Sequence, residues 1–237
     1  MTVDERIDDL AETLRQLRAE DTRLRVFGSP AHGYRLNPPL SEAEIRAFEA
    51  DHGIQLPEDY RLFLRVVGNG GPGPAYGLAT LAAAAESVDP RSPFPFAQAS
   101  SGYPDDVLDR WSDEPFGVLE LCHHGCAIYS YLVVNGAPRG TIWDGSGVDV
   151  EPTELGFLEW YRQWADSSLR KVRSEQRARA LRVGMSTDEV MQAVEGAWKK
   201  RQPADGSVTY FEAPGIPAQL EVDERDRVAR IIPWQFL

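Results

Sequence analysis

The residues best suited to chemistry form one short run, Cys122-His123-His124-Gly125-Cys126. Cysteine and histidine suit zinc, and a structural zinc site takes four such ligands. Adjacent side chains on a strand point to opposite faces, so Cys122 and His123 do not easily share one ion. The chain has two further histidines, His32 and His52. We therefore interpret His124-Gly125-Cys126 as a tight strand-to-strand turn and expect no metal and no cofactor.

A Cys/His nucleophile pair is the second chemistry that this run suggests, because Cys126 lies two residues after His124. A nucleophilic cysteine needs a lowered pKa and an accessible sulfur atom. Cys126 opens an apolar stretch, which predicts a buried, inert thiol. The chain has no G-x-S-x-G motif, and its carboxylate pairs lack partners for acid–base work. We expect no catalytic residue, although an enzyme with an unrecognised site stays an alternative.

The glycine-rich loop from Gly68 to Gly73 suggests a phosphate cradle. A dinucleotide fingerprint follows a strand and opens a helix, whereas this loop follows a helical pattern and enters a proline-containing segment. No G-K-S/T sequence accompanies it. The loop is better explained as a backbone turn whose glycines adopt positive φ.

Two helices must precede this loop. Ser41 and Glu44 form a capping box, and Gly53 is placed to end the first helix. Pro57 suits the first position of the second helix, which Gly68 would end. Its buried face is predicted by i, i+3, i+4 and i+7 spacing, at Tyr60, Phe63, Leu64 and Val67.

The order of these motifs resembles the SUKH superfamily of Smi/Knr-type proteins. The family's L-P-x-D/E-Y motif is matched by Leu56, Pro57, Asp59 and Tyr60. Its N-G-G-x-G loop and Y-G-L ending are matched by Asn69, Gly70, Gly71, Gly73, Pro74, Tyr76, Gly77 and Leu78. The H-G-C turn also recurs in this family, without any metal being implied.

Strand patterns follow at Val118 to Leu121, Cys126 to Val134, and Thr141 to Trp143. Asn135-Gly136 and Asp144-Gly145 are turn dipeptides, so we expect the first hairpin to turn near Asn135. Residues 155–166 predict a helix with a stripe of Phe157, Leu158, Tyr161 and Trp164. This segment is similar to the second half of a SUKH domain, and the resemblance covers about residues 40–166.

Further helices and strands are expected elsewhere in the chain. Residues 4–20 predict a helix with Ile7, Leu10, Leu14 and Leu17 on one face, and a short helix is expected from Asp105 to Trp111. Residues 169–182 are basic and form either a linker or an extension of the preceding helix. A second capping box, Ser186 with Glu189, opens a helix with Val190, Met191 and Val194, which Gly196 weakens at its end. Three short strand patterns follow, at Val208 to Glu212, Gln219 to Val222 and Arg227 to Ile232.

The expected fold class is therefore α+β. Residues 1–168 should form a SUKH-like domain, with a mostly antiparallel sheet surrounded by helices, and residues 169–182 a basic linker or helix. Residues 183–237 should form a small α+β module that is similar to the BamE/SmpA type. No lipoprotein cysteine is present, so the outer-membrane role of that family is not carried over.

Charge and composition narrow the choice of partners. Residues 1–168 hold 27 Asp and Glu against 13 Lys and Arg, a net charge of −14, whereas residues 169–237 hold 10 against 12, or +2. An acidic surface repels nucleic acid and steers basic partners toward itself. No apolar run is long enough to span a bilayer, the N-terminal segment is not a signal peptide, and two cysteines make no disulfide framework. We expect a cytoplasmic protein that binds neither membrane nor nucleic acid.

The resemblance implies a protein-binding function. Many bacterial SUKH proteins look like immunity proteins for delivered toxins, often nucleases, and an acidic surface fits a basic toxin domain. A regulatory scaffold of the Smi/Knr type is the alternative. We expect Tyr60, Phe63 and Trp164 in the core. Exposed carboxylates should carry recognition, with Glu58, Asp59, Asp105, Asp106, Asp144 and Asp149 as the candidate partner-binding residues.

Overall fold

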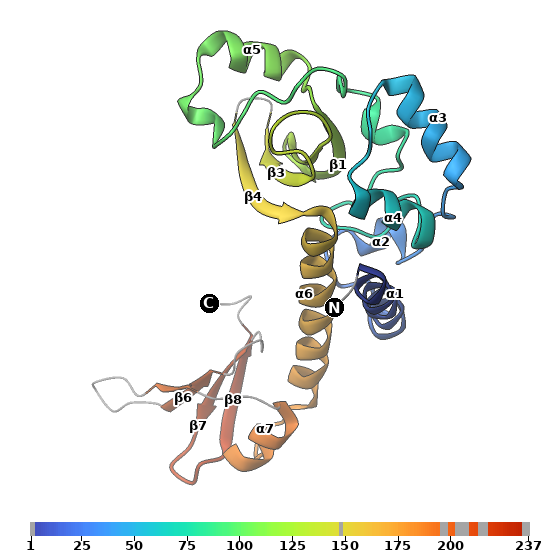
Figure 1. Cartoon of the computed structure of the whole chain (residues 1–237). Coiled ribbons are helices and arrows are strands. Elements are labelled where there is room, and N and C mark those ends of the chain that lie inside the picture. The colour runs from blue at the N-terminus through green and yellow to red at the C-terminus, as the bar shows by residue number, and fades with distance from the viewer. Residues whose placement is uncertain (1–2, 147–148, 195–198, 202–208, 213–217, 234–237) are drawn as a thin grey trace. The chain divides into compact units, whose positions relative to one another are not determined.

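The structure is a computed structural model, and it describes residues 3–146, 149–194, 199–201, 209–212 and 218–233. The chain divides into two compact units, Met1–Asp166 and Ser167–Leu237, and helix α6 (Phe157–Ala180) runs from the first into the second. Helices and antiparallel sheets alternate along the chain (Figure 1), which confirms the α+β class. The predicted boundaries at 168, 182 and 183 stay a prediction, and so does the BamE/SmpA-like character of the second part.

The first unit opens with four helices: α1 (Val3–Glu20), α2 (Ser29–His32), α3 (Glu42–His52) and α4 (Glu58–Val66). The apolar stripe predicted for α1 is buried along its whole length. Both halves of the Ser41–Glu44 capping box are formed, and Gly53 ends α3 with a φ of 62°. Helix α4 has Pro57 at its N-cap and ends at Val66, two residues before the glycine that was expected to stop it.

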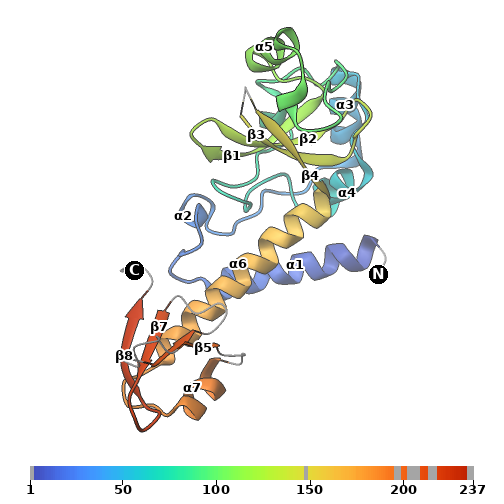
Figure 2. The same ribbon diagram turned by 90° about the vertical axis from the view of Figure 1, so that its left-hand side faces the viewer.

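Two short 3₁₀ turns, η1 (Ala83–Ala85) and η2 (Ser100–Gly102), lead to α5 (Asp105–Asp113). An antiparallel sheet follows in the order β1 (Val118–Gly125), β2 (Ile128–Val133), β3 (Thr141–Gly145) and β4 (Val150–Gly156). Figures 1 and 2 both show α5 on one side of this sheet and the first turns of α6 on the other. The sheet is therefore the middle layer of the first unit.

Aromatic side chains fill the core on both sides of the sheet. On the α5 side, Trp111 contacts the rings of Phe94, Phe96 and Tyr131 at centroid distances of 5.3 to 5.5 Å. On the other side, Phe63 of α4 packs edge-on against Phe157 and Tyr161 of α6, both at 5.0 Å. Tyr60 and Phe63 are fully buried as predicted, but Trp164 is only half-buried. The expected core position of Trp164 is therefore wrong.

Two predictions about the strands are also wrong. The first hairpin turns at Cys126 and Ala127, whose φ angles are 51° and 57°, and not near Asn135, which lies between β2 and β3. Two successive left-handed residues are what a type I′ hairpin turn requires, and here neither is glycine. Strand β4 was missed altogether, because Pro152 and two glutamates, Glu151 and Glu154, mask its strand pattern.

In the second unit, residues 169–180 continue α6, so the basic stretch is an extension of the preceding helix. Ser186 and Glu189 form the predicted capping box at the start of α7 (Thr187–Val194). Four antiparallel strands follow, and the first of them was not predicted: β5 (Lys199–Arg201), β6 (Thr209–Glu212), β7 (Ala218–Val222) and β8 (Val228–Pro233). Val190 is buried but Met191 is exposed, whereas Gly196, Val208 and the side chain of Val194 lie outside the described residues.

Candidate partner-binding surface

The two cysteines of the Cys122–Cys126 run lie in opposite environments. Cys122 is buried in β1, its thiol donates to the Pro74 carbonyl at 2.8 Å, and burial raises its pKa to about 12. Cys126 is exposed at the hairpin turn, so the expectation that it would be buried is wrong. Strand β2 begins at Ile128, two residues later than the strand pattern suggested, so the Cys126 side chain lies in the turn and outside the sheet.

The sheet brings together a histidine, a serine and an aspartate that sequence reasoning did not connect. His124 Nε2 lies 2.7 Å from Ser130 Oγ, and that hydroxyl donates to Asp144 Oδ1 at 2.5 Å. In a catalytic triad the serine gives its proton to the histidine, whereas here its proton is directed to the carboxylate. Ser130 is also fully buried. The arrangement therefore joins three strands and presents no nucleophile.

Asp144 consequently has a structural role. Its carboxylate accepts a hydrogen bond from the buried Ser130 hydroxyl, and the residue itself is half-buried. Its expected exposure is therefore wrong. Among the described residues no group of three or more His, Cys, Asp or Glu side chains is placed to hold a metal ion. The absence of a metal requirement stays a prediction, which elemental analysis of protein purified without added metal would test.

The two acidic residues at the start of α4 differ from each other. Glu58 is exposed. Asp59 is half-buried, and its carboxylate accepts the backbone N–H of Tyr60 at 2.8 Å and of Leu158 at 3.1 Å. Because Leu158 lies in the first turn of α6, Asp59 satisfies a backbone donor that the helix itself leaves unpaired. The expected exposure of Asp59 is wrong, and the residue ties α4 to α6.

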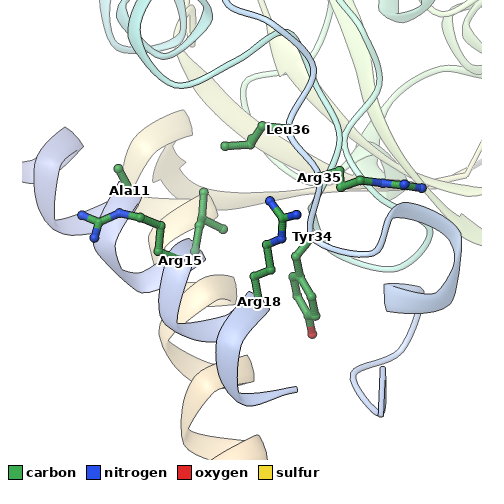
Figure 3. Close-up of a pocket in the computed structure, with 7 residues that line it drawn as sticks. Ala11, Arg15, Arg18, Tyr34, Arg35 and Leu36 are labelled. Atoms are coloured by element: carbon green, nitrogen blue, oxygen red, sulfur yellow. The ribbon is translucent and has the colours of Figure 1, made fainter. Parts of the chain in front are cut away.

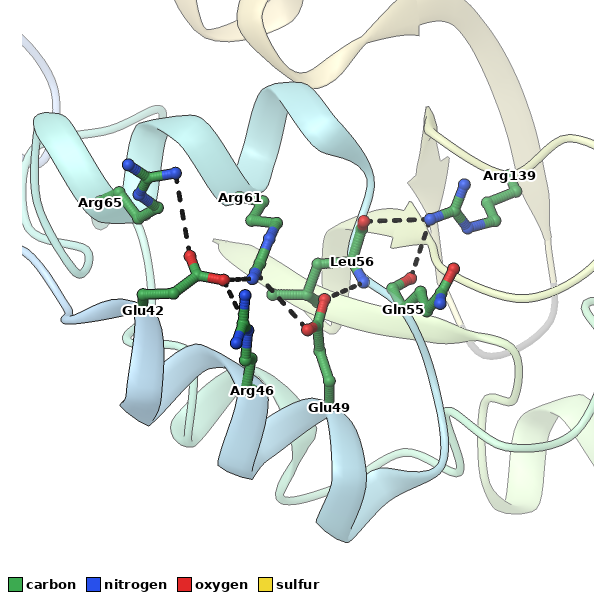
Figure 4. Close-up of polar contacts among 8 residues, drawn as sticks. All are labelled: Glu42, Arg46, Glu49, Gln55, Leu56, Arg61, Arg65 and Arg139. Carbon is green, nitrogen blue, oxygen red and sulfur yellow. Dashed lines mark hydrogen bonds and ion pairs between the residues drawn. The ribbon is translucent and has the colours of Figure 1, made fainter.

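Glu42 and Glu49 of α3 are also engaged within the protein (Figure 4). Glu42 accepts from Arg46 at 2.8 Å and lies 3.8 Å from Arg65, and it also bonds Arg61. Glu49 accepts the Leu56 N–H at 2.9 Å and lies 3.5 Å from Arg61. The hydrogen bond from Arg61 is the main cause that lowers the pKa of Glu42. This network fixes α3 on α4.

Arg139, from the loop between β2 and β3, extends this network to the sheet (Figure 4). Its guanidinium donates to the carbonyl oxygens of Gln55 and Leu56, at 3.0 Å each. The arginines near α3 and α4 are therefore occupied by internal acceptors, and they do not form a basic surface.

Helix α5 carries acidic residues of another kind. Asp105, Asp106, Asp109 and Asp113 are all exposed, and no hydrogen bond or ion pair to their carboxylates occurs within the described part of the chain. At about 100° per residue these four positions fall within an arc of about 100°, on the side opposite Trp111. We call these four residues the α5 acidic face.

The basic residue within α5 does not neutralise this face. Arg110 lies with its guanidinium carbon 4.2 Å from the centre of the Phe116 ring, and it donates to Ser92 Oγ at 3.3 Å. Like charges four residues apart on a helix repel one another, at a cost of about 0.2–0.5 kcal/mol per pair. Asp113 also lies in the last turn, where the helix dipole favours a cation. Asp105 and Asp106, in the first turn, complement the helix dipole, whereas Asp109 and Asp113 do not serve the stability of the helix.

Asp149 lies close to the segment that leads into α5. Its carboxylate accepts from Ser100 Oγ at 3.2 Å, and the same hydroxyl accepts the N–H of Val150 at 2.9 Å. Ser100 is buried, so this pair of bonds fixes η2 on β4. Of the six predicted site residues, Asp105, Asp106 and Asp149 thus lie in one part of the first unit, and Glu58 lies at the start of α4.

A cleft in the first unit is basic instead. It lies between α1 and residues 34–36, and it is lined by Ala11, Leu14, Arg15, Arg18, Tyr34, Arg35 and Leu36. Figure 3 shows Arg18 directed into the space, whereas the guanidinium groups of Arg15 and Arg35 point away from it. Arg15 also pairs with Glu12. The three cations therefore do not converge on one ligand.

One comparison with known proteins found a match. A model of the SMI1 / KNR4 family (SUKH-1) matches residues 39–155, which confirms the resemblance seen in the sequence motifs. The matched residues run from the loop before α3 to the end of β4, and they include α5 and the whole first sheet. No curated protein and no solved structure matches the chain.

Proposed function

We propose that this chain, whose residues 39–155 belong to the SUKH-1 family, is a non-enzymatic binding protein that neutralises a bacterial toxin with a basic surface. Binding covers the active site or the substrate groove of the toxin. A nuclease fits this description best, because its groove is cationic in order to hold the phosphates of its substrate.

The α5 acidic face is the observation that carries this proposal. Four carboxylates without internal partners lie on one exposed side of a helix that a fully buried tryptophan holds in place. Their mutual repulsion is relieved when a cationic surface docks, so the arrangement favours the complex over the free protein. Complementary charge also raises the association rate and selects against acidic partners.

A binding function without catalysis is supported by the environment of the groups that could react. The serine of the His124–Ser130–Asp144 arrangement is buried, and burial lowers the pKa of His124. The thiol of Cys122 is buried, with a pKa of about 12. No helix of the described residues has the length and apolar character to cross a membrane. We place the protein in the cytoplasm, where an imported nuclease would act.

Co-expression tests the proposal. The full chain and the product of the neighbouring gene are produced together in a sensitive cell, and survival is compared with cells that make the toxin alone. We expect protection, together with a complex whose association rate falls as salt rises. A variant with Asp109→Lys and Asp113→Lys should protect less well, whereas Val66→Ala, an exposed change on α4, should protect fully. If the chain protects against no adjacent toxin and its real partner binds independently of salt, the proposal is wrong. A partner without toxic activity would favour the regulatory scaffold.

A further inference from the structure

Four aromatic side chains from three separate segments form a continuous row on the surface of the first unit. Phe27 and Tyr76 are 59% and 52% exposed, and their ring centres are 5.3 Å apart. Tyr76 stacks on His123 at 5.8 Å, and His123 contacts Tyr129 at 4.8 Å. We call these four residues the aromatic row. Large exposed side chains normally occur singly, so their contact with one another requires an explanation.

The backbone holds the row in place. Gly28 has a φ of 80°, and the Ala75 carbonyl oxygen lies 1.5 Å from the position that a Cβ atom would occupy, so the loop of Phe27 packs directly on that of Tyr76. The N–H of Tyr76 donates to the His123 carbonyl at 3.4 Å, and His123 and Tyr129 are cross-strand partners in β1 and β2. A row that is ordered before binding loses little conformational entropy when a partner docks.

A carboxylate lies near the Tyr129 end of the row. Glu120 is the cross-strand partner of Tyr131, whose ring lies 5.9 Å from that of Tyr129. Glu120 is half-buried, and its carboxylate has no hydrogen bond or ion pair within the described part of the chain. Burial raises the pKa of this carboxyl, while the charge of His123 acts in the opposite direction. A half-buried anion without a hydrogen bond or ion pair gains more from a docking cation than a fully hydrated one does.

Aromatic faces next to a carboxylate are the surroundings that a guanidinium group prefers. Arginine stacks on rings through its planar face and can form two hydrogen bonds with one carboxylate, whereas the ammonium of lysine is a compact, strongly hydrated charge. Tyrosine is also among the residues that most often dominate binding energy at protein interfaces. The net charge of −14 over residues 1–168 favours a basic occupant over a neutral or acidic one.

We propose that the aromatic row binds an arginine-containing segment of the partner protein, and that Glu120 receives one of its guanidinium groups. This inference rests on the proposed function and adds a second contact surface to the α5 acidic face. The acidic face attracts the partner over distance, and the row distinguishes arginine from lysine at contact.

Two peptides of equal charge test whether the aromatic row distinguishes arginine from lysine. The full chain is titrated calorimetrically with nona-arginine amide and with nona-lysine amide at physiological salt. We expect the arginine peptide to bind about fivefold more tightly, as one or two exposed cation–π contacts provide. In a double variant, Phe27→Ala with Tyr76→Ala, this preference should disappear. Val66→Ala, at a similarly exposed apolar position, should keep it.

Variants at the two surfaces separate the contributions. Glu120→Gln keeps the shape of the side chain and should weaken the arginine peptide about threefold, roughly the value of one partly exposed ion pair. Asp109→Asn with Asp113→Asn should weaken both peptides equally and leave their ratio unchanged. Circular dichroism spectra and unfolding midpoints of all variants show whether each has kept its fold.

Three results would overturn the inference. The first is an arginine preference that survives in the Phe27→Ala, Tyr76→Ala variant, and the second is the absence of any preference in the unchanged protein. The third is a protein that sediments as a dimer and becomes a monomer in that variant, which would assign the row to contacts between copies. None of these removes the proposed function, which the co-expression experiment and the salt dependence of partner binding test separately.

Discussion

Helices α3 and α5 are both acidic, yet the three glutamates of α3 form bonds within the described part of the protein, whereas the aspartates of the α5 acidic face do not. On α3, Glu42 and Glu49 are taken up by arginines and by a backbone N–H, and Glu44 closes a capping box with Ser41. On α5, none of the four aspartates of the acidic face has such a partner within the described residues. The difference shows that acidic composition alone does not identify a binding surface. What identifies it is the absence of an internal counter-charge.

The largest effect on this comparison should come from Trp111, which anchors α5 in the core. Trp111 is fully buried among Phe94, Phe96 and Tyr131. Trp111→Ala should lower the free energy of unfolding by about 3–5 kcal/mol, because it leaves a large cavity. Denaturant unfolding measures the loss, and Trp111→Phe should restore a large part of it. A loss below about 1 kcal/mol would show that α5 is held by other contacts.

A smaller effect should separate a paired carboxylate from an unpaired one. Glu49→Ala removes the acceptor for the Leu56 N–H and the partner of Arg61, so we expect a loss of about 1–3 kcal/mol of unfolding free energy. Asp109→Ala on α5 should change it by no more than about 0.5 kcal/mol. Equal losses in the two variants would contradict the distinction between the helices.

Charge reversal on α5 should affect stability and binding in opposite directions. Asp113→Lys places a cation in the last turn of the helix and should stabilise it by about 0.3–1 kcal/mol. Together with Asp109→Lys, it should slow association with a basic partner about tenfold at low salt. Stopped-flow association rates and unfolding curves of the same protein measure both effects. A binding loss that persists unchanged at high salt would point to a contact effect instead of electrostatic steering.

The smallest effect concerns acid stability. Hydrogen bonds from Ser41, first from its hydroxyl and then from its backbone, lower the pKa of Glu44 in the folded state. The stabilisation is therefore fully present above the unfolded value of about 4.5, and it is lost as the pH falls through the lower folded value. Glu44→Gln should flatten the stability curve between about pH 5 and 3. Ser41→Ala should flatten it similarly, and a curve unchanged in both variants would refute this origin.

Local signals in the sequence predicted local structure well. Each capping box spans four residues, and the apolar stripes of α1 and α4 follow one helical period, so neighbouring residues alone determine them. The family motifs then indicated the α+β fold of the first unit, which the match over residues 39–155 confirms. Strand β4 and the exact position of the first hairpin turn, at Cys126 and Ala127, escaped prediction because tertiary context, and not residue preference, stabilises them there.

The candidate site was predictable only in part. Exposure was predicted correctly for Asp105, Asp106, Asp149 and Glu58, whose side chains lie at helix starts or loops. Asp59 and Asp144 could not be distinguished from them, because their partners, Leu158 and Ser130, are distant in the chain. The aromatic row was missed for the same reason, since Phe27, Tyr76 and His123 meet only after two loops have packed against strand β1.

The contrast between the two cysteines allows a dye to be attached selectively at Cys126. Only the thiolate form reacts readily with maleimides, so the buried Cys122, with its pKa of about 12, is protected, whereas Cys126 is open to solvent. Cys126 sits between His123 and Tyr129 in the chain, at the tip of the hairpin that carries half of the aromatic row. An environment-sensitive dye attached there would brighten or dim as a partner arrives, without any engineered residue.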